Sequence, residues 1–252
     1  MFSRISRQYE DSSAIVIGAG GIGGAIIRLL ASHAARLVVG DRDPSLLAEL
    51  ESTGGAAEMH THEIDVSDPA SVTEFFTFVN GKVGVPQYLF HTAGILNLES
   101  LEQTTPTLWD RAMDVNLNGA FYCARAAAEL MIPRKTGSIL MLGSIAGTRA
   151  RSGSRVNPAY NATKAGLSAF VNAAAMQLRP HGIRINCISP GPTSTPMMKQ
   201  QPQQVHDAIG QITLDGRQNS PEEVAELALF VAAHGRFTGE DLGMGGGAGL
   251  GG

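Results

Sequence analysis

The sequence lacks the features that mark several classes of protein. It has two cysteines, Cys123 and Cys187, which are too few for a disulfide framework in 252 residues and do not have the spacing of metal ligands. We therefore expect two buried thiols in a reducing compartment. No apolar run approaches the roughly 18 residues of a membrane-spanning helix, and residues 1–11 do not resemble a signal peptide. These absences favour a cytoplasmic protein without a membrane partner.

An excess of positive charge is also absent. The chain has 19 Lys and Arg against 23 Asp and Glu, a formal net charge of −4. Nucleic acids and anionic membranes attract clustered Lys and Arg, so neither is expected as a partner. The histidines are scattered without ligand spacing, and we predict no metal site; those considered are His91, His181, His206 and His234.

Short apolar runs alternate with helical patterns along the chain. This alternation predicts an α/β fold over residues 1–252: a single doubly wound domain with a mostly parallel seven-stranded sheet and helices on both faces. Residues 190–216 have weak periodicity, and we expect them to form a mobile lid. The Gly-rich tail at about 245–252 is expected to be poorly ordered. Strands are predicted at 14–18, 36–41, 59–65, 87–92, 137–143, 183–189 and 241–244, and helices at 22–35, 44–52, 68–80, 105–132, 158–179 and 221–233.

A glycine-rich turn follows the first predicted strand. Gly18, Gly20 and Gly23 have the G-x-G-x-x-G spacing, which allows a tight turn and close approach of the backbone to a pyrophosphate. The next helix adds free N–H groups and the positive end of its dipole. Asp41 ends the second strand, where a carboxylate accepts hydrogen bonds from ribose hydroxyls and repels a 2′-phosphate. The unit predicts a dinucleotide site that prefers NAD to NADP, although Arg42 partly offsets the repulsion.

A tyrosine and a lysine share one face of the helix predicted at 158–179. Tyr160 and Lys164 are four residues apart and so are neighbours on a helix surface. An ammonium beside a phenol stabilises the phenolate and lowers the phenol pKa from about 10. Ser144 follows the strand at 137–143, where its hydroxyl can hold a substrate oxygen opposite the phenol. The three side chains predict acid–base chemistry on a hydroxyl or carbonyl group.

These features occur in an order typical of one family. The glycine turn is followed by Asp41, Asp65-Val66, Ala93-Gly94, Asn116, Ser144, Tyr160 with Lys164, and Pro190-Gly191, within residues 14–246. In this order the sequence resembles the short-chain dehydrogenases/reductases in their compact form. The resemblance implies a Rossmann fold, a nicotinamide cofactor, and hydride transfer between a secondary alcohol and a ketone.

The resemblance also implies a role for each matched residue. Tyr160 is the general acid/base, Lys164 lowers its pKa and bonds the nicotinamide ribose, and Ser144 polarises the substrate oxygen. Asn116, rather than Asn118, bends its helix and holds a water of the proton relay. The expected cofactor contacts are Gly18, Gly20, Gly21, Ile22 and Gly23 of the turn, Asp41 and Arg42 at the ribose, Asp65 and Val66 at adenine, Ala93 and Gly94 after the fourth strand, Tyr160 and Lys164, and Pro190, Gly191, Thr193 and Thr195 at the nicotinamide.

Several positions depart from the family pattern. Two residues instead of three separate Gly18 from Gly21, so the turn is one residue shorter. His91-Thr92-Ala93-Gly94 stands where the family has Asn-Asn-Ala-Gly, and we expect Thr92 to replace the lost asparagine contacts. The segment from Ser144 to Tyr160 is longer than usual, and Gly245-Gly246-Gly247 replaces a C-terminal Asp-Gly-Gly.

The substrate stays open at this point. Arg149, Arg151 and Arg155 lie in the longer segment and offer the hypothesis of an anionic substrate group, although we favour solvated loop charges or subunit contacts as their explanation. One alternative function is a 3-oxoacyl-thioester reductase that uses NADPH, which Asp41 disfavours. Another is a non-catalytic dinucleotide-sensing regulator, which the retained Tyr160 disfavours. The resemblance further implies a homodimer or homotetramer formed through the long helices at 105–132 and 158–179.

Overall fold

The seven predicted strands form one sheet in the computed structural model, which describes residues 7–33, 36–53, 58–96, 98–148, 157–199 and 203–248. The strand order is β3-β2-β1-β4-β5-β6-β7, and all six pairings are parallel. The predicted doubly wound α/β fold is confirmed, with a fully parallel sheet where a mostly parallel one was expected. The strands are β1 (Ser13–Ile17), β2 (Arg36–Asp41), β3 (Met59–Glu63), β4 (Tyr88–His91), β5 (Gly137–Leu142), β6 (Ile183–Pro190) and β7 (Asp241–Met244).

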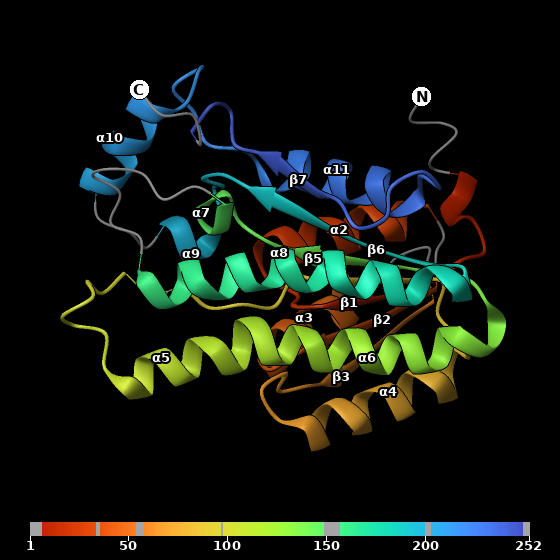
Figure 1. The fold of residues 1–252 in the computed structure, drawn as a ribbon. Helices are drawn as coiled ribbons and strands as arrows, with labels where there is room; N and C mark the ends of the chain where they lie inside the picture. Colours follow the sequence, from red (N-terminus) through yellow and green to blue (C-terminus); the bar gives the residue numbers. More distant parts are fainter. Residues whose placement is uncertain are drawn as a thin grey trace.

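Helices cover both faces of the sheet (Figure 1). One face packs against α2, α3 and α11, and the other against α4, α6 and α8. The helices are α2 (Gly21–Ser32), α3 (Pro44–Thr53), α4 (Pro69–Val83), α5 (Pro106–Met113), α6 (Gly119–Met131), α7 (Ile145–Thr148), α8 (Pro158–Leu178), α9 (Pro196–Lys199), α10 (Gln203–Ile212) and α11 (Pro221–Ala233).

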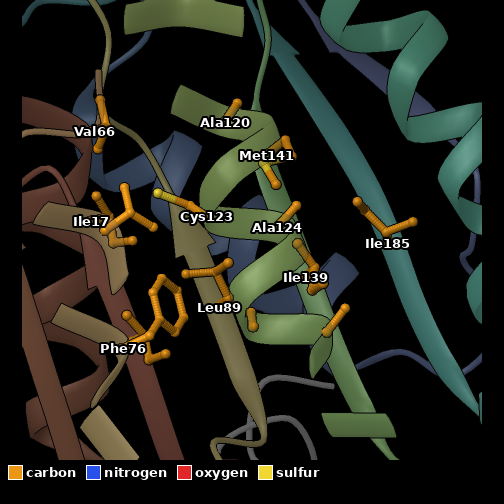
Figure 2. Packing of buried hydrophobic residues seen from close by; sticks show 14 of the residues in the cluster. Ile17, Val66, Phe76, Leu89, Ala120, Cys123, Ala124, Ile139, Met141 and Ile185 are labelled. Carbon is orange, nitrogen blue, oxygen red and sulfur yellow. The ribbon is translucent and has the colours of Figure 1, made fainter. Parts of the chain in front are cut away.

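Two apolar cores result from the alternation of side chains along the strands. Successive residues of a strand point to opposite faces. In β1, Ile15 and Ile17 join the core under α4, α6 and α8, whereas Ala14 and Val16 join the core under α2 and α11. Figure 2 shows the first core, in which Cys123 of α6 packs among side chains of β1, β4 and β5. Burial of the apolar strands on both faces stabilises the sheet. The connecting loops lie at its carboxyl edge.

The single helix predicted at 105–132 is interrupted in the structure. A π-helical segment, Asp114–Asn118, separates α5 from α6. A π segment adds a residue to one turn and redirects the side chains around it, and such segments are frequent at functional sites. Asn116 lies in this segment and is buried, in agreement with its expected place at a bend. The prediction of one continuous helix was wrong here, because apolar periodicity does not register one extra residue.

Two segments have more structure than predicted. Residues 190–216 include α9 and α10, so the expected weakly structured loop was wrong for its described part. The glycine tail is tied down through residue 248, since Gly246 O accepts a bond from Leu214 N at 2.7 Å and Ala248 is 1% exposed. The short helix α7 was not predicted.

Within the ranges given above, none of the helices combines the length and the apolar character needed to cross a membrane. Cys123 and Cys187 are both buried free thiols, as expected.

Candidate active site

The predicted site residues gather at the carboxyl edge of the sheet. Gly18 follows β1, Asp41 ends β2, Gly94 follows β4, Ser144 follows β5 and Gly191 follows β6. Because the strands are parallel and adjacent, their carboxyl ends open onto one crevice, where ligands bind in doubly wound sheets. In Figure 1, α7, α9 and α10 lie at the end of the sheet toward which the strand arrows point.

The glycine turn is shaped by close backbone packing. Gly18 has φ +97° and Gly21 has φ +45°, a region that side chains disfavour. A Cβ atom on Gly23 would lie 1.7 Å from Gly18 O, so only glycine fits there. Gly20 begins α2 as its N-cap, and a Cβ on it would meet no atom closer than 4.0 Å. The turn thus leaves bare backbone at the N-terminus of α2, beside the buried side chain of Ile22.

Thr92, expected to replace the lost asparagine contacts, bonds to the glycine turn. Its Oγ1 donates to Gly18 O at 2.8 Å and lies within 3.0 Å of Ile17 O. The hydroxyl occupies the notch left by the absent side chains of Gly18 and Gly23. Ala93 N also donates to Ile17 O at 3.0 Å. The loop after β4 therefore fixes the glycine turn from behind.

Asp41, the residue predicted to bind the ribose, is bonded to the glycine turn. Its Oδ2 accepts from Ala19 N at 2.6 Å, and its Oδ1 accepts from Asp43 N at 2.9 Å. The carboxylate is thereby held at the end of β2 with lone pairs remaining for a ligand. Arg42 is exposed beside it.

Asp65 and Val66 follow β3 at the predicted adenine position. Asp65 Oδ1 accepts from both the backbone N and the Oγ of Ser67, at 3.0 and 2.6 Å. The hydrogen bond from the Ser67 side chain holds the pKa of Asp65 below its usual value. Val66 is buried against α6, where a Cβ on Gly119 would lie 2.8 Å from Val66 Cγ2.

The loop after β6 reaches the glycine turn. A Cβ on Gly191 would lie 2.8 Å from Gly245 Cα, so the backbone of the C-terminal tail closes against Gly191. Thr193 is buried, and its Oγ1 donates to Gly191 O at 3.0 Å. Thr195 lies over the turn, since a Cβ on Gly21 would be 3.0 Å from Thr195 Cγ2. The residues from Pro190 to Thr195 thus border the predicted cofactor site from the side opposite Asp41.

Tyr160, Lys164 and Ser144 meet where α8 crosses the end of β5. Lys164 Nζ lies 5.7 Å from the centre of the Tyr160 ring and donates to Leu142 O at 2.8 Å. Ser144 lies close enough to Tyr160 for its side chain to lower the pKa of the phenol. The structure therefore brings together the phenol, the ammonium and the hydroxyl that the sequence had indicated.

The ionisation of this cluster differs from the expectation in one respect. The pKa of Tyr160 is raised, because burial outweighs the effect of the Ser144 side chain. Burial also lowers the pKa of Lys164 to about 8, with Cys187 acting in the opposite direction. The lysine is thus close to its own titration at neutral pH, and the protein environment does not by itself produce a phenolate.

Asn116 joins the π segment to the loop after β4. Its Oδ1 accepts from Ile95 N at 2.8 Å, and its Nδ2 donates to Ile95 O at 3.0 Å and to Thr163 Oγ1 at 3.3 Å. A Cβ on Gly94 would lie 3.2 Å from Asn116 Oδ1 and 3.6 Å from Lys164 Nζ. The absence of a side chain at Gly94 therefore leaves space beside both the asparagine and the lysine.

Two buried polar residues of the site were not given a role from the sequence. His91 ends β4; its Nε2 has no hydrogen-bond partner in the described part of the chain, and burial together with Lys164 lowers its pKa to about 3. Asn157 caps α8 with its side chain. The pair Asn157-Pro158 is a recognisable helix start, so the cap could have been found.

The three arginines considered for an anionic substrate group lie outside the described residues; they are Arg149, Arg151 and Arg155. Among the residues that are described, no three His, Cys, Asp or Glu side chains gather as a metal ion would require.

Comparison with known proteins identifies the family of the chain. A family model described as enoyl-(acyl carrier protein) reductase matches residues 17–248. The chain is 34% identical to an uncharacterised oxidoreductase, YxbG, of Bacillus subtilis, over 94% of this chain and 91% of the relative. It is 33% identical to a 3-alpha-(or 20-beta)-hydroxysteroid dehydrogenase of Mycobacterium tuberculosis, over 86% of this chain and 80% of the relative.

A solved structure shows the same fold. It is a 3-oxoacyl-[acyl-carrier protein] reductase of Brucella melitensis with bound NAD, with a TM-score of 0.85 and 27% sequence identity over 98% of this chain and 94% of that one. The sequence is thus matched over nearly the whole chain, and the protein belongs to the short-chain dehydrogenase/reductase family.

Proposed function

We propose that the protein is an NAD(H)-dependent oxidoreductase that interconverts a small secondary alcohol and its ketone, with Tyr160 as general acid/base. The observation that carries the proposal is the meeting of Tyr160, Lys164 and Ser144 beside the end of β5, on the edge where the glycine turn and Asp41 also lie. The oxidoreductase class follows from the family; the cofactor and the substrate class are the proposal.

The chain offers a fitting surface for a dinucleotide. Gly20 and Gly21 leave the backbone at the N-terminus of α2 free of side chains. A Cβ atom on Gly20 would meet no atom closer than 4.0 Å, whereas Thr195 lies beside Gly21. Free N–H groups at a helix N-terminus favour a pyrophosphate. Asp41 and Arg42 would hold the adenosine ribose, and Lys164 the nicotinamide ribose. The bound nicotinamide would supply the acceptor or donor of hydride.

The side chains of the cluster handle the proton. Ser144 donates a hydrogen bond to the substrate oxygen and holds it against the phenol of Tyr160. In oxidation Tyr160 takes the hydroxyl proton, and in reduction the protonated phenol gives it back. The cation of Lys164 lowers the free energy of the phenolate, an effect that buried surroundings strengthen.

The preference for NAD rests on the carboxylate of Asp41. A 2′-phosphate at this place would meet that negative charge, whereas ribose hydroxyls donate to it. The solved reductase of Brucella melitensis carries NAD, which supports the assignment. We expect NADH to bind more tightly than NADPH, and Asp41→Asn to weaken NADH binding about tenfold, because a hydrogen bond to a charged group contributes about 1.5–3 kcal/mol.

Titration of purified protein with each cofactor, followed by nicotinamide fluorescence, tests this preference. Asp43→Asn is the matched control. It removes an equal charge only two residues from Asp41, and the carboxylate of Asp43 accepts a hydrogen bond from Ser45 N. A wild-type preference for NADPH would contradict the assignment. Loss of affinity in both variants alike would show a general effect of charge.

A second candidate is reduction of a 3-oxoacyl thioester. The description of the matching family model and the Brucella melitensis reductase favour it. Parallel assays of cyclohexanone with NADH and of an acetoacetyl thioester with NADPH separate the two. We expect the ketone with NADH to be turned over faster. The reverse result would make the thioester the substrate class, and binding of both cofactors without any turnover would favour a dinucleotide-sensing role.

The proposal includes a homo-oligomer formed through α6 and α8. Phe121 of α6 is 42% exposed and contacts Phe170 of α8, and Met176 on the same helix is 74% exposed. Burial of such a surface against a second copy would stabilise a dimer. Light scattering at micromolar concentration should show a dimer or tetramer that Phe121→Glu dissociates; a monomeric wild-type protein would refute it.

A further inference from the structure

The first turn of α8 is attached to the loop between β4 and α5 by one side chain. Asn157 is fully buried and lies three residues before Tyr160. Its Oδ1 accepts from Ala159 N at 2.8 Å and from Tyr160 N at 3.1 Å. Its Nδ2 donates to Glu99 O at 2.9 Å and to Thr104 Oγ1 at 3.0 Å. Both ends of the amide are therefore fully used.

These bonds act directly on the backbone of the catalytic tyrosine. Tyr160 is the third residue of α8, so its N–H has no partner within the helix and depends on a cap. Its carbonyl oxygen accepts from Thr163 Oγ1 at 2.7 Å, and that hydroxyl accepts from Asn116 Nδ2 at 3.3 Å. The peptide of Tyr160 is thus held by Asn157 on one side and, through Thr163, by Asn116 on the other.

The same two asparagines hold the loop that follows β4. Asn116 bonds both backbone groups of Ile95, and Asn157 bonds Glu99 O and the Thr104 hydroxyl. The loop lies at the carboxyl end of β4, where ligands of such sheets bind. Asn157 therefore connects the backbone of the tyrosine to this loop. A helix cap that only accepted hydrogen bonds from the N–H groups of α8 would not make that connection.

We propose that Asn157 is a positioning residue for Tyr160: its carbonyl oxygen fixes the phenol relative to Ser144, and its amide nitrogen fixes the loop at 98–104 against the same helix. The two halves of the amide have separable consequences. Loss of the oxygen moves Tyr160 and lowers kcat, and loss of the nitrogen loosens the loop and raises the KM of the substrate. The kinetic part of this inference rests on the proposed function.

Four variants separate positioning from capping. Asn157→Ala removes all the bonds, Asn157→Asp keeps the capping oxygen, and Thr104→Val removes one contact of the nitrogen. Asp68→Ala is the matched control, because Asp68 caps α4 through Ala70 N at 2.9 Å with a proline at the next position, as Asn157 does in α8. With cyclohexanol and NAD, we expect Asn157→Ala to lower kcat at least about tenfold, since small misplacements of reacting groups cost up to about a hundredfold. We expect Asn157→Asp to keep kcat within about twofold and raise KM severalfold, and Thr104→Val to raise KM less.

A second readout needs no turnover. The ¹³Cζ resonance of Tyr160, assigned with Tyr160→Phe, reports the pKa of the phenol. In Asn157→Ala this pKa should fall toward its usual value, as the phenol gains water, whereas Asn157→Asp and Asp68→Ala leave it unchanged.

The outcomes are distinct. If Asn157→Ala only lowers Tm by a few degrees, as Asp68→Ala does, with kcat and the tyrosine titration unchanged, Asn157 is a cap alone and the inference is wrong. If the wild-type protein turns over no alcohol, the proposed function fails, and the tyrosine titration still decides the role of Asn157. If Asn157→Ala does not fold, Asn157→Asp and Thr104→Val decide it through the split between KM and kcat.

Discussion

The glycine turn after β1 and the catalytic cluster on α8 lie on one edge of one sheet, but the chain builds them differently. The turn is made of backbone: Gly18 has a positive φ, and Gly23 leaves no space for a Cβ atom. The cluster is made of side chains held by other side chains, as Asn116 and Asn157 hold the peptide of Tyr160 and its loop. The part of the edge proposed to bind the cofactor, the binding half, thus depends on the absence of side chains at its glycines. The part proposed to move the proton, the catalytic half, depends on hydrogen bonds between residues that are distant in the sequence.

The largest effect on turnover short of removing the tyrosine is expected from the lysine. Lys164→Met removes the cation beside the phenol and should lower kcat about 10²- to 10³-fold, the range found when one group that stabilises transition-state charge is deleted. Steady-state assays of alcohol oxidation measure it. A loss under about threefold would mean that the catalytic half does not depend on this charge.

The glycine turn is best tested by two neighbouring substitutions. In Gly23→Ala the new methyl would lie 1.7 Å from Gly18 O, so the turn must shift, whereas in Gly20→Ala it meets no atom closer than 4.0 Å. Overpacking of this kind costs about 1–3 kcal/mol and more when backbone must move. Thermal unfolding should show a Tm far below wild type for Gly23→Ala and near wild type for Gly20→Ala. Equal Tm values would show that the turn is not as closely packed as described.

The pH dependence separates lysine from tyrosine. Lys164 has a pKa lowered to about 8, so its charge is present below that pH and is lost above it. The raised pKa of Tyr160 keeps the phenol protonated over the same range. Ketone reduction should therefore decline as pH rises through about 8, and Lys164→Arg, which stays charged, should remove that decline. A rate that is constant up to pH 10 in the wild-type protein would contradict the assignment.

The smallest expected effect concerns the contact between the loop after β4 and the glycine turn. Thr92→Val keeps the shape of the side chain but removes the hydrogen bond to Gly18 O. We expect a loss of stability of about 1 kcal/mol and a few-fold weaker binding of NADH. Thr73→Val, which removes an exposed hydroxyl bonded to Pro69 O, is the matched control. If both variants bind NADH equally well, Thr92 is not needed to hold the turn.

The local structure of the binding half is the part that the sequence predicted most directly, because its signals are local. The spacing of Gly18, Gly20 and Gly23, and the acid at the end of β2, can be recognised within a few residues of each strand. The alternation of apolar runs also predicted the sheet, since a parallel strand buried on both faces is a short apolar run. The predicted last strand, Asp241–Met244, has the bounds found in the structure.

The catalytic half was predicted only in part. Tyr160, Lys164 and Ser144 were identified, but the raised pKa of Tyr160 comes from burial that no motif records. The bonds of Asn157 join residues more than 50 positions apart, which spacing cannot show. The π segment at Asn116 was missed because apolar periodicity does not register one inserted residue, and α9 was missed because four residues are too few to show a period. The apolar residues of α10 recur at helical spacing, so this helix could have been predicted from the sequence.

The proposed function implies that the glycine turn and Asp41 supply most of the affinity for NAD, whereas Tyr160 moves the proton, so that cofactor binding and turnover can be separated at the tyrosine. Tyr160→Phe tests it most directly when NADH affinity and alcohol oxidation are measured on the same preparation. We expect NADH affinity within about twofold of wild type and a kcat lower by about 10²- to 10⁴-fold, the usual contribution of a general acid/base. Unchanged turnover would contradict the role of Tyr160, and lost NADH binding would contradict the separation of the two halves.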